Sequence, residues 1–131
     1  EENSQSGFAA PLNHAAPFGV TFGERIQSGG HTKSAEMVAN NMADIASLDA
    51  VTWELIKRYD DFASDLRVLE RTNPTTPALP FITSLANDPA VILDALTAAL
   101  KTLPHEQKQT LCLLGLTQIP AADYLCIPNP A

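Results

Sequence analysis

The sequence predicts an α/β protein in which a parallel-type sheet is flanked by helices. Short apolar runs of the kind found in buried parallel strands, at 45–48 and 66–69, alternate with longer segments of helical periodicity. Turn residues, chiefly Gly, Pro, Ser and Asn, separate these segments. This strand–helix–strand rhythm is typical of βαβ units, whose strands run parallel.

Length and composition indicate one small globular protein. The 131 residues are 45% hydrophobic and 18% charged, which is typical of a chain that folds around a core. The net charge of −7 argues against nucleic-acid binding and against attraction to anionic membranes, because both need clustered positive charge. We expect no membrane span, since no uncharged apolar stretch approaches about 18 residues. No signal peptide is visible at Glu1-Glu2-Asn3.

The first 30 residues show little periodicity. A short helix is predicted at 8–15, limited by Pro11, because a proline past the first turn removes a hydrogen bond and clashes with the preceding turn. Residues 25–28 form a short strand candidate. It runs into Gly29-Gly30, where the backbone is free to turn sharply.

Two helices are predicted in the middle of the chain. The first spans 32–42 and should end at Asn40-Asn41, because Asn tolerates the left-handed conformation. The second follows Asp49, where the strand candidate 45–48 ends. Its apolar face has the spacing i, i+4, i+5, i+8 and is formed by Val51, Leu55, Ile56 and Tyr59.

The C-terminal part begins with an extended segment at 79–83 and continues with helices. Asp88-Pro89 is a strong helix start, with Asp as the cap and Pro at the first position, and the amphipathic pattern continues to about Leu103. Pro104 begins another helix, which Gly115 is predicted to close.

Two cysteines, Cys112 and Cys126, lie 14 positions apart. They could form a disulfide or remain two buried thiols, and the sequence leaves both possibilities open. There is no C-x-x-C motif or His/Cys cluster, so we expect no bound metal and no cofactor.

Two hydroxyl-rich, glycine-bearing turns are candidates for anion binding. They are Ser4-Gln5-Ser6-Gly7 and the segment 28–34, which contains His31 and Thr32. Each is expected to lead into a helix, whose first N–H groups lack internal partners and carry partial positive charge. Such donors can hold an oxyanion such as phosphate without a net positive charge. The alternative is ordinary helix capping by Ser or Thr.

Asp49 is a further candidate, because it ends a predicted strand and begins a helix. In open parallel sheets, ligands bind beyond the carboxyl ends of the strands. Asp49 could face an ammonium group or accept a hydrogen bond from a protonated phosphate oxygen; alternatively it is a helix N-cap. Trp53 could line a pocket or belong to the core. No triad order, carboxylate pair or Walker-type lysine loop supports an enzyme.

A family resemblance rests on segments in a specific order. Together with Ser4-Gln5-Ser6-Gly7 they are 28–34, 43–53, 66–72 and 79–83. This order resembles the phosphate/phosphonate-type substrate-binding proteins of ABC importers, which have the type II periplasmic binding fold. The resemblance runs from residue 3 to about residue 125.

The resemblance implies an anion site in a cleft between two lobes. Residues 1–72 would be the second, ligand-gripping lobe without its first strand, and 73–131 the C-terminal part of the first lobe. The residues implied in ligand binding are Ser4, Gln5, Ser6, His31, Thr32 and Asp49. The first five would hold phosphonate or phosphate oxygens, and Asp49 would face the other end of the ligand. An ABC permease would be the partner, the location periplasmic or extracytoplasmic, and no catalysis is implied.

Chains of this family are longer, and their N-terminal portion has no counterpart in this sequence. We therefore expect a fragment whose incomplete sheet leaves open edges, and a homodimer with exchanged elements. Two other interpretations stay open. One is a sensory or interaction module with the same fold and no transport role, and the other is a helix-rich scaffold without a ligand.

Overall fold

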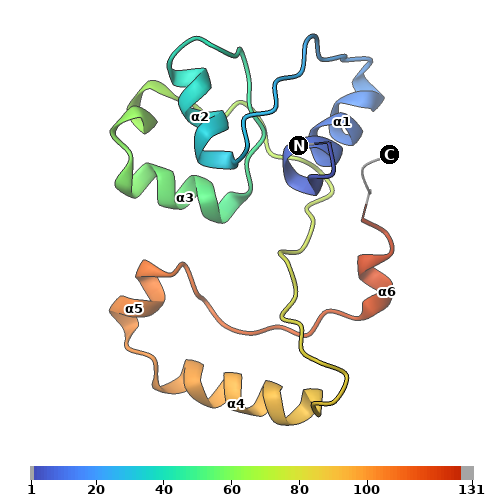
Figure 1. Cartoon of the computed structure of the whole chain (residues 1–131), viewed down its shortest axis with the longest axis vertical. Helices are drawn as coiled ribbons and strands as arrows, with labels where there is room; N and C mark the ends of the chain where they lie inside the picture. The colour runs from blue at the N-terminus through green and yellow to red at the C-terminus, as the bar shows by residue number, and fades with distance from the viewer. Residues whose placement is uncertain (1, 128–131) are drawn as a thin grey trace. The chain divides into compact units, whose positions relative to one another are not determined.

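The computed structural model describes residues 2–127 and divides the chain into two compact units. The first unit comprises Glu1–Thr76 and Cys126–Ala131, and the second unit covers Pro77–Leu125. Both consist of helices and of extended segments that join them (Figure 1). The assignment of residues 1–72 and 73–131 to two lobes stays a prediction.

The first unit opens with a helix whose first turn is wide. Its elements, in chain order, are η1 (Gln5–Ala9), α1 (Ala10–Ala15), η2 (Ala16–Phe18), α2 (His31–Ala39), α3 (Ala50–Tyr59) and η3 (Asp61–Asp65). The amide of Ala10 donates to the carbonyl of Gln5, five residues earlier, so η1 is a π turn. This turn directly precedes Pro11, which has no amide hydrogen and would clash in a regular α-helix. The helix expected at 8–15 is confirmed, with an earlier start.

Helices α2 and α3 supply two of the four buried apolar side chains in the described residues, and η1 and α1 supply the other two. Ile56 on α3 is only 1% exposed, and Ala35 on α2 is also fully buried. Asn41 has a φ of 57°, which confirms that the first of the two central helices ends at the asparagine pair. The second helix is confirmed as well, with Asp49 as its N-cap.

The predicted α/β class is wrong. No strand and no sheet occur in residues 2–127, which are helical or irregular. The segments 45–48 and 66–69 have no helical assignment and no ladder of hydrogen bonds to another segment. Val68 and Leu69 are 52% and 61% exposed, whereas a strand of a parallel sheet is buried on both faces. An apolar run favours an extended backbone, but a strand also needs a neighbouring strand as hydrogen-bond partner.

The second unit confirms one predicted helix and corrects another. It contains α4 (Pro89–Thr102), α5 (His105–Thr110) and α6 (Ala121–Tyr124). The carboxylate of Asp88 accepts a hydrogen bond of 2.9 Å from the amide of Ala90, as expected of the predicted cap. The prediction that Gly115 closes the following helix is wrong, because α5 ends at Thr110 and Cys112 takes the left-handed conformation with a φ of 55°.

The second unit has no core of its own. None of its described side chains is buried, and several large apolar side chains are almost fully exposed, among them Leu79, Ile82 and Leu114. Cys112 is half-buried, and Cys126 in the last described segment is exposed. The alternative of two buried thiols is therefore wrong.

Two further observations concern the whole described chain. Among the helices in residues 2–127, none combines the length and the apolar composition needed to cross a bilayer. The expected homodimer was based on the open edges of an incomplete sheet. Residues 2–127 contain no sheet, so the structure gives no support to a dimer of that kind.

Candidate functional site

The turn at Ser4–Gly7 is a capped helix start. The Oγ atom of Ser4 accepts a hydrogen bond of 3.0 Å from the amide of Gly7. A Cβ atom at Gly7 would lie 3.0 Å from this oxygen and 3.6 Å from Cε1 of His31. A side chain at Gly7 would therefore crowd the capping hydroxyl of Ser4, whereas its contact with the imidazole would be an ordinary van der Waals contact.

The second turn leads into α2 without a side-chain cap. Gly29 has a φ of 88°, a conformation that favours glycine. The hydroxyls of Ser28 and Ser34 are hydrogen-bonded to each other at 2.6 Å, which holds the turn together. Gly30 is the N-cap and has no side chain to offer, so the first amides of α2, those of His31 and Thr32, receive no side-chain cap.

The two turns meet at His31. Its Nε2 atom lies 3.1 Å from Oγ of Ser6 and 3.5 Å from Oδ2 of Asp49. The side chains of His31 and Asp49 are half-buried. Residues 4–7, 28–34 and 49, which the sequence singled out separately, therefore form one cluster in the first unit.

Asp49 has two roles, as N-cap of α3 and as neighbour of His31. Its Oδ1 accepts a hydrogen bond of 2.8 Å from the amide of Thr52, and its Oδ2 accepts one from the hydroxyl of the same residue. Burial raises the pKa of Asp49, but the bonds from Thr52 and the nearby imidazole of His31 outweigh burial and lower it below the ordinary value. The carboxylate is held in its charged form, beside a ring that can become cationic.

Two further hydrogen bonds brace the Ser4–Gly7 turn. The hydroxyl of Ser47 donates a bond of 2.7 Å to the carbonyl of Ser6, and the hydroxyl of Thr76 donates one of 3.3 Å to Oε1 of Gln5. The Nε2 atom of Gln5 is buried and has no hydrogen-bond partner in the described chain. Because buried polar atoms are normally paired, this amide is a donor without its acceptor.

Comparison with known families identifies the chain. A family model described as "ABC transporter, phosphonate, periplasmic substrate-binding protein" matches residues 1–124. The chain belongs to this family. No curated protein and no solved structure matches it significantly. The resemblance inferred from the order of the sequence segments is thus confirmed at the level of the family.

In this phosphonate-binding family member, the structure brings three of the six predicted ligand residues into direct contact, namely Ser6, His31 and Asp49. Ser4 and Gln5 lie in the same turn as Ser6. Thr32 directly follows His31 and is exposed at the start of α2. The proximity of these residues is an observation, and their role in ligand binding stays a prediction.

The contact between a serine, a histidine and an aspartate does not have the geometry of a hydrolase relay. In such a relay, one ring nitrogen contacts the serine and the other contacts the aspartate. Here Ser6 and Asp49 both lie beside Nε2 of His31. This arrangement cannot pass a proton from the serine through the ring toward the aspartate, but it can hold a charged imidazole next to a carboxylate.

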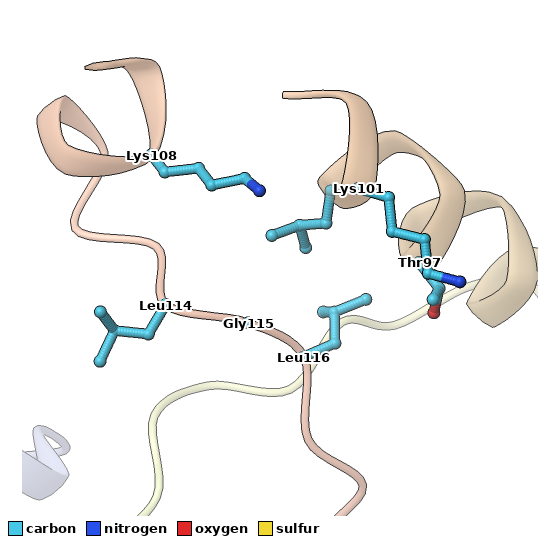
Figure 2. Close-up of a pocket in the computed structure, with 7 residues that line it drawn as sticks. Thr97, Lys101, Lys108, Leu114, Gly115 and Leu116 are labelled. Atoms are coloured by element: carbon cyan, nitrogen blue, oxygen red, sulfur yellow. The ribbon is translucent and has the colours of Figure 1, made fainter. Parts of the chain in front are cut away.

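A separate hollow lies in the second unit. It has a volume of about 260 Å³ and lies between α4, α5 and residues 114–116 (Figure 2). Leucines line it together with Thr97, Lys101 and Lys108, and none of the predicted ligand residues takes part. No group of three or more metal-ligating side chains occurs in the described residues.

Sequence analysis missed three residues that brace the cluster. Ser47 lies inside a run interpreted as a buried strand, Thr52 lies in the first turn of α3, and Thr76 lies in a proline-rich loop. A hydroxyl two residues before Asp49, in an otherwise apolar run, was the signal available for Ser47. Nothing in the sequence indicated that Thr76 reaches Gln5.

Proposed function

We propose that this family member captures a phosphonate, phosphate or related phosphorylated anion outside the cytoplasm and delivers it to an ABC permease, without catalysis. We propose further that residues 1–72 form the lobe that holds the anion. Membership of the phosphonate-binding family supports the general role. The anion itself and the residues that hold it are the new parts of the proposal.

The observation that carries the proposed site is the contact between Ser6 and His31. These residues belong to two different helix starts, and their side chains lie 3.1 Å apart. An oxyanion placed between them would receive a hydroxyl bond, an imidazole bond and the amides at the uncapped start of α2. The unpaired Nε2 of Gln5 supplies one more donor in the same turn.

Charge also supports an anion at this position. A protonated His31 would form charge-assisted hydrogen bonds, which are stronger than neutral ones. The carboxylate of Asp49 lies 3.5 Å from Nε2 of this ring. The same carboxylate would repel a fully ionised phosphonate unless the ligand presents a proton or an ammonium group to it. We therefore assign Asp49 to the selection of the ligand's other end.

Calorimetric titration with methylphosphonate and with inorganic phosphate tests the proposed site. We expect Ser6→Ala and His31→Ala each to weaken binding by about tenfold to 100-fold, because bonds to charged groups are worth about 1.5–3 kcal/mol. Ser64→Ala and His105→Ala are matched controls, since both residues are exposed and lie outside the cluster. Unchanged affinity in both site variants would refute the assignment.

The role of Asp49 needs a ligand with a cationic end. We expect Asp49→Asn to weaken binding of aminomethylphosphonate more than binding of methylphosphonate, because only the former can place an ammonium group beside the carboxylate. Asn retains a side-chain oxygen that can cap α3. An equal change for both ligands would mean that Asp49 acts only as a cap.

A further inference from the structure

Helix α4 is apolar around most of its circumference, yet it remains unburied. Its leucines at 93, 96 and 100 are half-buried, and Leu100 and Leu116 both line the hollow of the second unit. The opposite side is exposed, with Val91 63% exposed. A helix that is apolar on all sides is normally buried against a partner on each side.

The exposed side has the pattern of a helix-pairing face. Val91, Ala95, Ala98 and Thr102 follow one another at intervals of four, three and four residues, so they form one stripe along the helix. Three of the four side chains are small or short, and small side chains let a second helix approach closely.

Charges lie on only one edge of this stripe. Asp94 and Lys101 flank it on one edge, and Ile92 and Ala99 flank it on the other. Asp94 and Lys101 are seven residues, or about 10 Å, apart, which is too far for them to pair within the helix. Neither forms an ion pair in the part of the chain that the structure describes. Lys101 also lines the hollow of the second unit, together with Thr97 and Lys108 (Figure 2).

This pattern is complementary to itself in the antiparallel direction. When two copies of α4 pair antiparallel about a point between Thr97 and Ala98, like edges meet. Asp94 of each copy then faces Lys101 of the other, giving two ion pairs related by a two-fold axis. A parallel pair would place neither charge beside its opposite.

We propose that the exposed face of α4 binds a second copy of this chain, as an antiparallel helix pair with two-fold symmetry. Symmetric pairs of this kind are the commonest way in which identical chains associate. A helix of 14 residues is about 21 Å long, so the face alone is small for a permanent interface. The pair is therefore a weak dimer that forms as the concentration rises.

Sedimentation velocity over a concentration series of the whole 131-residue chain tests this dimer. Asp94→Lys and Lys101→Asp each replace two attractive pairs by two repulsive ones. An exposed ion pair is worth about 0.2–1 kcal/mol, so we expect each substitution to weaken dimerisation about tenfold or more. The double variant Asp94→Lys/Lys101→Asp restores opposite charges, so it should dimerise as the unaltered chain does.

Asp65→Lys is the control, because it makes the same charge change at an exposed residue of the first unit. Circular dichroism of every variant shows whether the helices persist. Should a reversal unfold the chain, Asp94→Asn and Lys101→Gln, which only neutralise the charges, should weaken the dimer by a smaller factor. A chain that stays monomeric at all concentrations, a dimer that tolerates both reversals, or a double variant that fails to recover would each overturn the proposal.

Discussion

The hydroxyl of Ser47 donates a hydrogen bond of 2.7 Å to the main-chain carbonyl of Ser6. This bond joins residues 41 positions apart and ties the segment before α3 to the first turn of the chain. Asp49 lies two residues after Ser47, the donor of this bond, and Ser6 is the residue whose carbonyl accepts it. The position of the carboxylate relative to the Ser6–His31 pair therefore depends on a hydroxyl that would touch no ligand.

Ser47→Ala is expected to affect both stability and binding. Loss of a typical hydrogen bond costs about 1 kcal/mol, and here it also leaves the carbonyl of Ser6 without this donor. Because the bond positions Asp49 and Ser6, we expect methylphosphonate to bind more weakly, by a larger factor than the loss of stability alone explains. Thermal unfolding by circular dichroism and calorimetric titration measure the two effects.

Ser64→Ala is the matched control for this variant. The hydroxyl of Ser64 also donates to a main-chain carbonyl, that of Asp61, at 3.0 Å, but the bond is local and exposed. It should cost less stability and leave binding unchanged. Equal effects of the two substitutions on binding would contradict a positioning role for Ser47.

The sequence predicted the helices better than the class of the fold, because helix signals are local. Asp88 and Pro89 define the start of α4, and Asp49 defines the start of α3, through contacts within three residues. A strand depends on a partner elsewhere in the chain. The apolar runs at 45–48 and 66–69 therefore suggested strands that the structure does not form, because the backbone groups of neither run pair with a neighbouring strand.

The candidate site could be predicted in part for a similar reason. Hydroxyls and glycines at helix starts are visible in the sequence, and the family resemblance placed Ser6 and His31 at one site. Their direct contact, and the bonds from Ser47 and Thr76, depend on how distant segments pack. At Gly115 a local signal was misleading. Glycine is a plausible helix end, but α5 ends earlier, at Thr110, and the left-handed residue after it is Cys112.

Gly7→Ala is expected to change stability little and binding strongly. Within a helix, Ala is favoured over Gly by about 0.5–1 kcal/mol. The added Cβ would lie 3.0 Å from Oγ of Ser4, so the cap must shift, and loss of a serine cap costs about 1 kcal/mol. These effects on stability nearly cancel, but the displaced Ser4 side chain caps the same turn that carries Ser6. Thermal unfolding and titration with methylphosphonate measure the two quantities.

A double-mutant cycle separates the two contributions. In the Ser4→Ala background there is no hydroxyl to displace, so Gly7→Ala should stabilise the chain by about 0.5–1 kcal/mol. If Gly7→Ala has the same effect on stability with and without the Ser4 hydroxyl, the crowding between the two side chains is not significant.

Ile56→Ala tests how much the first unit depends on its small core. Ile56 is the largest fully buried side chain in the described residues, and such a truncation costs about 2–5 kcal/mol. With so few buried residues in this unit, we expect α2 and α3 to lose most of their helicity at 37 °C. Val51→Ala on the same helix is the control, because Val51 is 45% exposed, and it should change stability by less than about 1 kcal/mol. Similar losses from both variants would show that the packing around Ile56 contributes little.

The lowered pKa of Asp49 predicts a dependence of stability on acid pH. Burial alone would raise this pKa, but the hydrogen bonds from Thr52 and the charge of His31 lower it in the folded chain. The folded state therefore favours the carboxylate. This contribution is fully present above the ordinary pKa of the unfolded chain, about 3.9, and is lost as the pH falls through the lower folded value.

We expect the stability advantage of the unaltered chain over Asp49→Asn to be constant from pH 7 to about pH 5 and to shrink below about pH 4. Thr52→Val removes the hydroxyl donor and keeps the amide donor, so it should reduce the advantage without abolishing it. Denaturant unfolding at a series of pH values measures these differences. Parallel pH profiles for the unaltered chain and Asp49→Asn would mean that the carboxylate gains nothing from Thr52 and His31 on folding.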